Sequence, residues 1–161
     1  MKMGNNWTKS FELSGKEKEE ALKKCYAVLE GWKIKMPNVE PIVLDFGLSD
    51  FRRTGLIEFW IANEEKEGYC GKFLFLFDEQ TCPAHYHDFK HETFFIVKGE
   101  VLMKTAEKEF LMKEGDAFAM NQGVVHSFTG EGNSLVLEAS KPCISGDNIF
   151  KNKRIGKNGK I

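Results

Sequence analysis

Apolar residues recur at helical spacing in one segment near the N-terminus. They are Leu22, Tyr26, Ala27, Leu29 and Trp32. The preceding Ser14-Gly15-Lys16-Glu17 has the spacing of a capping box, which marks the start of a helix. Pro37 cannot continue a helix, so it closes the segment. The pattern predicts an amphipathic helix over about residues 15–33 that packs one face on the rest of the protein.

Beyond Pro41 the helical pattern gives way to short apolar or alternating runs, separated by turn residues. The runs are Ile42-Val43-Leu44, Leu56 to Ala62, Tyr69 to Phe77, Thr93 to Val97, Val101 to Thr105, Glu109 to Met112, Ala117 to Met120, His126 to Thr129 and Leu135 to Ala139. Runs spaced by roughly 8 to 12 residues are typical of β-sandwiches and β-barrels. We therefore predict an all-β domain over residues 41–150, preceded by a helical extension over residues 1–40.

The last segment, residues 151–161, is basic and poor in apolar side chains. This composition predicts a solvated, loosely ordered tail, and a nucleic-acid-binding arm is the less favoured alternative.

The size and charge of the chain exclude several classes of protein. Its 161 residues are enough for one domain with a core, and its net charge of −1 gives no bias toward nucleic acid or membrane. No run approaches the roughly 18 apolar residues of a membrane span, and the polar N-terminus lacks the apolar region of a secretion signal. We expect a soluble cytoplasmic protein. The four cysteines form no CxxC pair, so a disulfide framework is not expected, and Cys82 is interpreted as a buried apolar side chain.

All four histidines of the chain lie between residues 85 and 126, together with a glutamate at a suggestive spacing. Neutral imidazoles plus one carboxylate are a common ligand set for a divalent transition metal. The predicted ligands are His85, His87, Glu92 and His126. Such a set leaves coordination positions open, as a catalytic site requires. We expect manganese, with zinc, iron, cobalt or nickel as alternatives.

The alternation of side chains along a strand supports this choice of ligands. His85 and His87 share one face of a strand. If the chain turns and re-enters a strand, Lys90 and Glu92 share a face while His91 points away. His91 is therefore left out of the ligand set.

Two signatures resemble those of the cupin superfamily. They are His85-x-His87-x4-Glu92-x6-Gly99 and Gly115-x5-Asn121-x-Gly123-x2-His126. The chain departs from the family at its turns, with Glu79 in place of a glycine, Asn121 in place of a proline and Gly130 in place of an asparagine. The resemblance implies a cupin-type antiparallel β-barrel, or jelly roll, with the metal inside.

A narrower resemblance covers about residues 40–150 and points to the D-lyxose ketol-isomerase branch of the cupins. The chain is similar to this branch in Cys82-Pro83-x-His85-x-His87-x2-Lys90-x-Glu92-Thr93-Phe94, in Leu137-Glu138-Ala139-Ser140 and in Asp147-Asn148. The resemblance implies a metal-dependent isomerase that interconverts D-lyxose and D-xylulose, and also D-mannose and D-fructose. It also implies that Lys90 and Glu138 are the acid–base residues.

The chemistry of this reaction agrees with the residues present. Aldose–ketose isomerisation moves a proton between adjacent carbons through an enediol, which needs a Lewis acid and a group that takes and returns the proton. We assign the proton to Glu138 and the stabilisation of the oxyanion to Lys90, although the two roles could be exchanged. The plainer alternatives stay open: Lys90 as a solvated residue or an ion-pair partner of Asp88 or Glu92, and Glu138 on the surface, since strand parity does not decide which way it faces.

Other features are less specific. The alternating residues Phe73, Phe75 and Phe77, and likewise Phe94 and Ile96, are interpreted as core residues, and a few of these aromatic residues, with Tyr86, could line a sugar pocket. Arg52-Arg53 is interpreted as a solvent-facing pair rather than a phosphate clamp, which favours a free sugar as substrate. Another cupin metalloenzyme (a dioxygenase or a phosphosugar isomerase) and a non-enzymatic sugar-binding module remain as alternatives. By analogy with other small barrels, we expect a homodimer.

Overall fold

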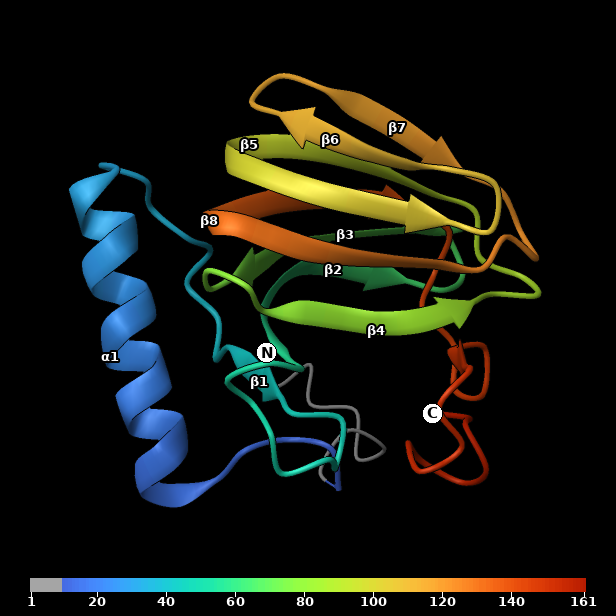
Figure 1. Cartoon of the computed structure of the whole chain (residues 1–161), viewed down its shortest axis with the longest axis horizontal. Helices are drawn as coiled ribbons and strands as arrows, with labels where there is room; N and C mark the ends of the chain where they lie inside the picture. The colour runs from blue at the N-terminus through green and yellow to red at the C-terminus, as the bar shows by residue number, and fades with distance from the viewer. Residues whose placement is uncertain (1–9) are drawn as a thin grey trace.

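The computed structural model describes residues 10–161, so the part of the N-terminal extension over residues 1–9 lies outside the described residues. In chain order the elements are α1 (Gly15–Gly31), β1 (Ile42–Leu44), β2 (Leu56–Glu64), β3 (Tyr69–Leu76), β4 (Thr81–Tyr86), β5 (Glu92–Thr105), β6 (Glu109–Lys113), β7 (Ala117–Met120), β8 (His126–Ser140) and β9 (Ile149–Phe150). The strands join in one antiparallel sheet that curls around an interior, with α1 standing at one side (Figure 1). The predicted all-β fold with an N-terminal helix is confirmed.

A long ribbon made of β5 and β8 organises the barrel. The two strands pair from Glu92 beside Ser140 to Thr105 beside His126, and each contributes one half to each wall. One wall consists of β7, β5, β8, β3, β2 and β1, and the other of β6, β5, β8, β4 and β9. The pairing shifts register on both sides of Lys98, next to Gly99. Gly99 has φ of +77°, and a Cβ there would collide with the backbone carbonyl of Asn133, so the bend requires a glycine.

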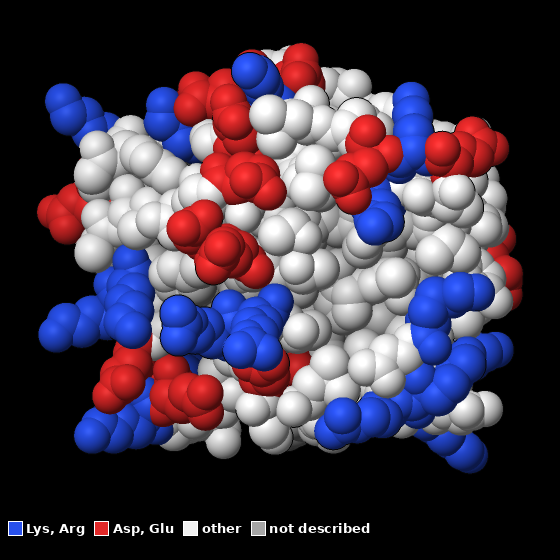
Figure 2. All heavy atoms as spheres, viewed as in Figure 1, with Lys and Arg blue, Asp and Glu red and all other residues white. Residues whose placement is uncertain are grey.

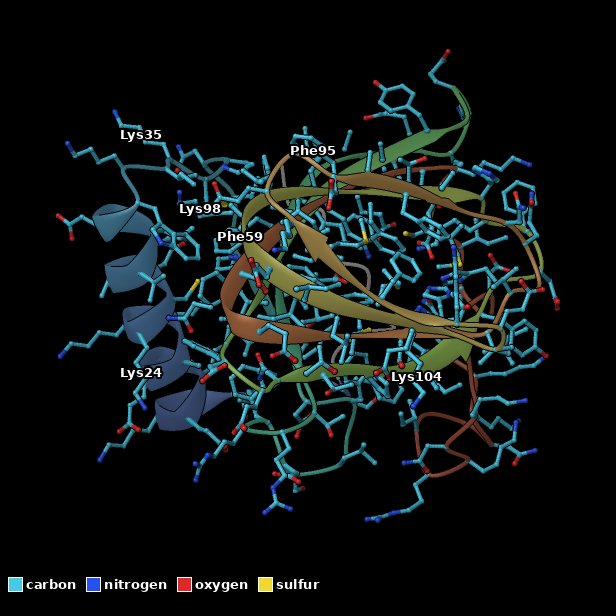
Figure 3. All side chains as sticks on the ribbon, turned by 45° about the horizontal axis from the view of Figure 1, so that its top comes forward. Lys24, Lys35, Phe59, Phe95, Lys98 and Lys104 are labelled. Carbon is cyan, nitrogen blue, oxygen red and sulfur yellow. The ribbon has the colours of Figure 1, made fainter. Side chains whose placement is uncertain are left out.

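The wall that carries β2 and β3 is buried on both faces. Its inner face joins the barrel core with residues such as Leu74 and Val136. Its outer face packs Phe59 and Phe75 against α1, and Phe59 lies on that side of the sheet in Figure 3. Two buried faces explain why these strands appear in the sequence as apolar runs rather than alternating ones.

The strand pattern differs from the sequence prediction in two respects. Thr93–Val97 and Val101–Thr105 are halves of β5, and His126–Thr129 and Leu135–Ala139 are halves of β8. The segments between the halves bend but keep pairing, which is why turn residues there suggested separate strands. The strands β4 and β9 were missed because β4 contains Pro83 and polar residues, and β9 has only two residues.

The helix begins and ends close to the prediction, but its details differ. Ser14 occupies the N-cap without a side-chain hydrogen bond, so the predicted capping box does not form. The buried face consists of Ala21, Cys25 and Leu29. Tyr26 is 45% exposed, and its ring packs against that of Phe59 in a T-shaped arrangement. No helix among residues 10–161 is long and apolar enough to cross a membrane.

The C-terminal segment is folded, so the prediction of a loosely ordered tail is wrong. Ile155 is fully buried, and the backbone of Ile161 exchanges hydrogen bonds with Asn148. The backbone N–H of Lys151 also donates to Ala84 of β4. The basic side chains of the segment still face solvent and gather at the lower right of Figure 2. The charge of these side chains predicted their exposure correctly. The backbone is nevertheless held under the barrel by the apolar side chains of Ile155 and Ile161 and by these hydrogen bonds.

Candidate metal centre and catalytic cavity

The four predicted metal ligands converge inside the barrel. His85 lies in β4, His87 follows that strand, and Glu92 and His126 begin β5 and β8. Their ligand atoms all lie within 4.8 Å of one another, and all four residues are buried. His91 is only half-buried and is not part of this cluster, in agreement with its predicted parity.

Each histidine of the cluster is oriented by a backbone carbonyl. The Nδ1 atoms of His85, His87 and His126 lie 2.8 Å from Pro83 O, 2.8 Å from Asp147 O and 2.9 Å from Val124 O. A carbonyl can only accept, so each Nδ1 carries the hydrogen and each Nε2 keeps a lone pair in the neutral ring. Burial, together with the neighbouring histidines, lowers the pKa of His85 well below its usual value, which favours the neutral form.

The carboxylate of Glu92 faces these lone pairs. Its Oε1 lies 2.9 Å from His126 Nε2 and 3.3 Å from His87 Nε2, and none of these three atoms has a hydrogen-bond partner. Acceptors buried this close together repel one another unless a cation lies among them. The mixed N and O donor set fits a divalent transition metal.

Lys90 connects this cluster to Glu138. Its Nζ lies 2.7 Å from Glu92 Oε2 and 2.9 Å from Glu138 Oε1. Both Lys90 and Glu138 are 3% exposed, so the alternatives of a solvated lysine and a surface glutamate are wrong, whereas the ion pair with Glu92 does form. Lys90 and Glu92 share a face, as strand parity predicted.

The charges of Lys90 and Glu138 stabilise each other. Burial opposes the charged lysine, but Cys143, Glu138 and Glu92 outweigh it, and the pKa of Lys90 is raised well above its usual value. Burial also opposes the charged form of Glu138, but Lys72 and Lys90 outweigh it and hold the pKa of that carboxyl below its usual value. Glu138 is therefore an ionised carboxylate at neutral pH.

Sequence reasoning missed a second ion pair beside Glu138. Lys72 Nζ lies 2.8 Å from Glu58 Oε1 and 3.5 Å from Glu138 Oε2. Glu58 and Lys72 are 6% and 7% exposed. The available signal was a single charged residue within each apolar run, Glu58 between Ile57 and Phe59 and Lys72 next to Phe73, because such a residue must find a partner inside.

Asp147 holds the loop that carries Lys90. Its two carboxylate oxygens accept hydrogen bonds from the backbone N–H groups of Asp88, Phe89 and Lys90, each at 2.9 Å. The carbonyl of Asp147 also accepts from His87. One residue therefore fixes both a candidate ligand and the approach of Lys90.

A cavity in the barrel is lined by residues of the candidate metal cluster and by the neighbouring buried ion pairs. Its lining includes His85, Glu92, Lys90, Glu138 and Lys72, with apolar walls formed by Phe94, Phe128 and Phe150 among others. Of the aromatic residues that the sequence suggested near the site, Phe94 lines the cavity, whereas Phe73, Phe75 and Phe77 pack on the helix side of the sheet as core residues. Tyr86 is not part of the lining either.

The four cysteines are free and buried, as expected for Cys82. Cys143 lines the cavity with its sulfur 3.8 Å from that of Cys70 and 3.9 Å from Lys90 Nζ. The hydrogen bond from Cys70, reinforced by the two lysines against the effect of burial, lowers the pKa of Cys143 to about 7. Burial raises the pKa of Cys25 to about 12.

Comparisons with known proteins show which family this chain resembles. The family model described as D-lyxose isomerase matches residues 10–105, and the one described as cupin domain matches residues 74–139. A D-lyxose/D-mannose isomerase from Thermosediminibacter oceani is 30% identical, with 84% of this chain and 87% of that protein covered. A D-lyxose ketol-isomerase from Thermofilum sp. is 27% identical, with 89% of this chain and 94% of that protein covered.

A solved structure supports the fold independently. An L-ribose isomerase from Cellulomonas parahominis, solved with L-ribose, matches with a TM-score of 0.75 at 16% identity, over 94% of this chain and 98% of that chain. At this identity the match shows a shared fold.

Proposed function

Since the chain belongs to the D-lyxose isomerase family of the cupins and is an aldose–ketose isomerase, we propose that it interconverts a free aldose and its ketose through an enediol. The candidate pairs are D-lyxose with D-xylulose and D-mannose with D-fructose. The names of the two relatives support this choice. The observation that carries the proposal is the continuous contact from Glu92, a metal ligand, through Lys90 to Glu138 in one cavity.

Glu138 is the group that we propose to move the proton. Its carboxylate is ionised, so it can take the proton from C2 of the aldose and return it to C1 of the enediol. The opposite assignment needs a neutral Lys90, which the adjoining carboxylates of Glu92 and Glu138 oppose. Lys90 instead donates a hydrogen bond to the oxygen on which negative charge develops.

The metal would be held by His85, His87, Glu92 and His126, and when bound it would polarise the carbonyl and hydroxyl oxygens of the sugar. We propose manganese, since the N and O donors suit it along with zinc, iron, cobalt and nickel. The homodimer and the cytoplasmic location stay predictions.

The charges of the cavity support an unphosphorylated substrate. The lysines of the lining, Lys72 and Lys90, are each held between two carboxylates, and no arginine is part of the lining formed by the described residues. Arg52 and Arg53 are exposed outside the cavity. A phosphate would therefore meet no available cation of the protein there.

Proton NMR in heavy water tests the proposal. We expect manganese-loaded protein to convert D-lyxose, and separately D-mannose, to ketose with deuterium at C1. Glu138→Gln keeps the shape of the side chain but removes the base, so turnover should fall by about 10²–10⁴-fold with metal content unchanged.

Each negative result of these experiments would refute a different part of the proposal. The absence of ketose from both sugars at full metal occupancy would refute these substrates, and faster turnover of the 6-phosphate of mannose would refute the preference for a free sugar. Unchanged turnover of Glu138→Gln would remove Glu138 from the mechanism.

A further inference from the structure

Buried charges of alternating sign extend past Glu138 to the far side of the cavity. In order of contact they are Glu58, Lys72, Glu138, Lys90 and Glu92. The most exposed of them, Lys72, is only 7% exposed. The proposed mechanism uses the members from Glu138 to Glu92 and leaves Glu58 and Lys72 without a role.

The position of Lys72 is fixed from several directions. Lys72 in β3 is the direct cross-strand partner of Glu138 in β8 and of Trp60 in β2. Glu58 Oε1 lies 2.8 Å from Lys72 Nζ, while Glu58 Oε2 accepts a hydrogen bond of 2.8 Å from Trp60 Nε1. The ammonium group also lies 5.0 Å from the centre of the Trp60 ring. Glu58 and Trp60 therefore hold the lysine head in one place.

The two oxygens of Glu138 have different neighbours. Lys90 Nζ and Ser140 Oγ donate to Oε1 at 2.9 and 3.0 Å. Lys72 Nζ lies 3.5 Å from Oε2, too far for a strong hydrogen bond but close enough to attract the charge. A lone pair on Oε2 therefore remains available within the cavity.

We infer that Lys72, held by Glu58, is a positioning residue that orients the carboxylate of Glu138 for proton transfer. The inference rests on the proposed role of Glu138 as the group that moves the proton. Lys72 fixes the rotation of the carboxylate from the side opposite Lys90, so that Oε2 points at the reacting carbons in every turnover. Misplacement of a catalytic group by about 1 Å is enough to slow a reaction by about 10²-fold.

The presence of charge at this position favours a catalytic over a purely structural role. An apolar pair of similar volume would fill the same space without the cost of removing two ions from water. Trp60 and Leu74 show that apolar residues are accepted on the same inner face.

The pH profile of turnover tests this role, because it reports the ionisation of Glu138. Every titratable or polar group that faces Glu138 contributes to that ionisation. Among the described residues these groups are Cys70 and Lys72 on β3, Cys82 on β4, Lys90 in the loop before β5, Glu92 at the start of β5, Ser140 at the end of β8 and Cys143 after it, with Glu58 behind Lys72. Lys72 is the cation on the Oε2 side. Its removal disfavours the ionised carboxylate, so the acid limb of kcat should move to higher pH.

The test compares Lys72→Met with Lys72→Arg in the metal-loaded enzyme. For Lys72→Met we expect kcat to fall by about tenfold or more with KM changed by less than about threefold, and the acid limb to move to higher pH. Lys72→Arg keeps the charge, so the acid limb should stay in place. The surface variant Lys104→Met removes a cation that pairs with Glu109 outside the barrel and should behave as wild type.

If Lys72→Met does not fold, the charge-balanced double variant Glu58→Gln/Lys72→Met takes its place with the same expectations. A rise in KM at constant kcat would overturn the inference in favour of direct substrate binding by Lys72. An unchanged kcat in the Lys72→Met variant, with or without a loss of thermal stability, would overturn the inference in favour of a structural role. Two controls come first: the wild-type protein must convert the sugar, and the Glu138→Gln variant must be inactive. If either control fails, the proposed function fails, independently of the role of Lys72.

Discussion

Replacement of Lys90 by methionine offers a direct measure of the electrostatic link between the metal and Glu138. The change keeps most of the side-chain volume but leaves Glu92 Oε2 and Glu138 Oε1 without the cation now 2.7 and 2.9 Å away. At an effective dielectric constant of about 20, each contact is worth roughly 6 kcal/mol of gross attraction, most of which is offset by the desolvation of the lysine. Broken buried ion pairs of this kind typically cost about 3–5 kcal/mol.

The loss of stability caused by Lys90→Met should depend on whether metal is bound. In metal-free protein we expect the full loss of about 3–5 kcal/mol in the free energy of unfolding, or a fall in Tm of roughly 6–20 °C for a chain of this length. In metal-loaded protein the metal compensates Glu92, and Lys72 stays 3.5 Å from Glu138, so the loss should shrink to about half. The side-chain exposures of 66% and 49% in the Lys104–Glu109 pair predict a loss of at most about 1 kcal/mol for Lys104→Met.

Urea denaturation followed by tryptophan fluorescence, with chelator and with excess manganese, measures both values. A loss in the metal-free Lys90→Met protein no larger than that in Lys104→Met would refute the ion-pair reasoning. An equal loss with and without metal would show that Glu92 is not a metal ligand.

Two further predictions concern the bend at Gly99 and the thiol of Cys143 in the cavity. Gly99→Ala should lower the free energy of unfolding by roughly 2–4 kcal/mol more than Gly132→Ala, because both have positive φ but only Gly99 faces a backbone carbonyl, and equal denaturation midpoints would contradict this. Iodoacetamide should modify Cys143 at a rate that rises with pH around a midpoint of about 7, since the thiolate is the reactive form, while Cys25 with a pKa of about 12 stays unmodified. Peptide mapping measures both rates, and equal modification of the two cysteines would be evidence against a thiolate in the cavity.

The sequence was most informative where side-chain alternation and chemistry agreed. Alternation predicted one shared face for His85 and His87 and another for Lys90 and Glu92, and the structure brings His85, His87 and Glu92 together with His126. Alternation could not place Glu138, because its strand lies in a wall with two buried faces. The structure settles the direction: Leu135 packs on the helix side, while Val136 and Glu138 face the interior.

Other features depend on tertiary contacts that no local pattern reveals. The second ion pair forms because register places Lys72 opposite Glu138. Residues 151–161 are mostly polar, yet Ile155 anchors them beneath β4. Turn residues inside β5 and β8 predicted breaks, whereas the partner strand carries the pairing through the bend.

The folded-over ribbon of β5 and β8 has a consequence for how the candidate metal site is assembled. Glu92 and His126 stand at opposite ends of this ribbon, since Glu92 pairs with Ser140 and His126 with Thr105. At about 3.3 Å per residue, a straight ribbon of this length would hold the two ligands roughly 40 Å apart. Strand pairing alone therefore does not bring Glu92 and His126 together, and the bend in the ribbon is what places them in one cluster. A metal ion held by Glu92 and His126 would therefore tie together the two ends of the strand pair that shapes the barrel.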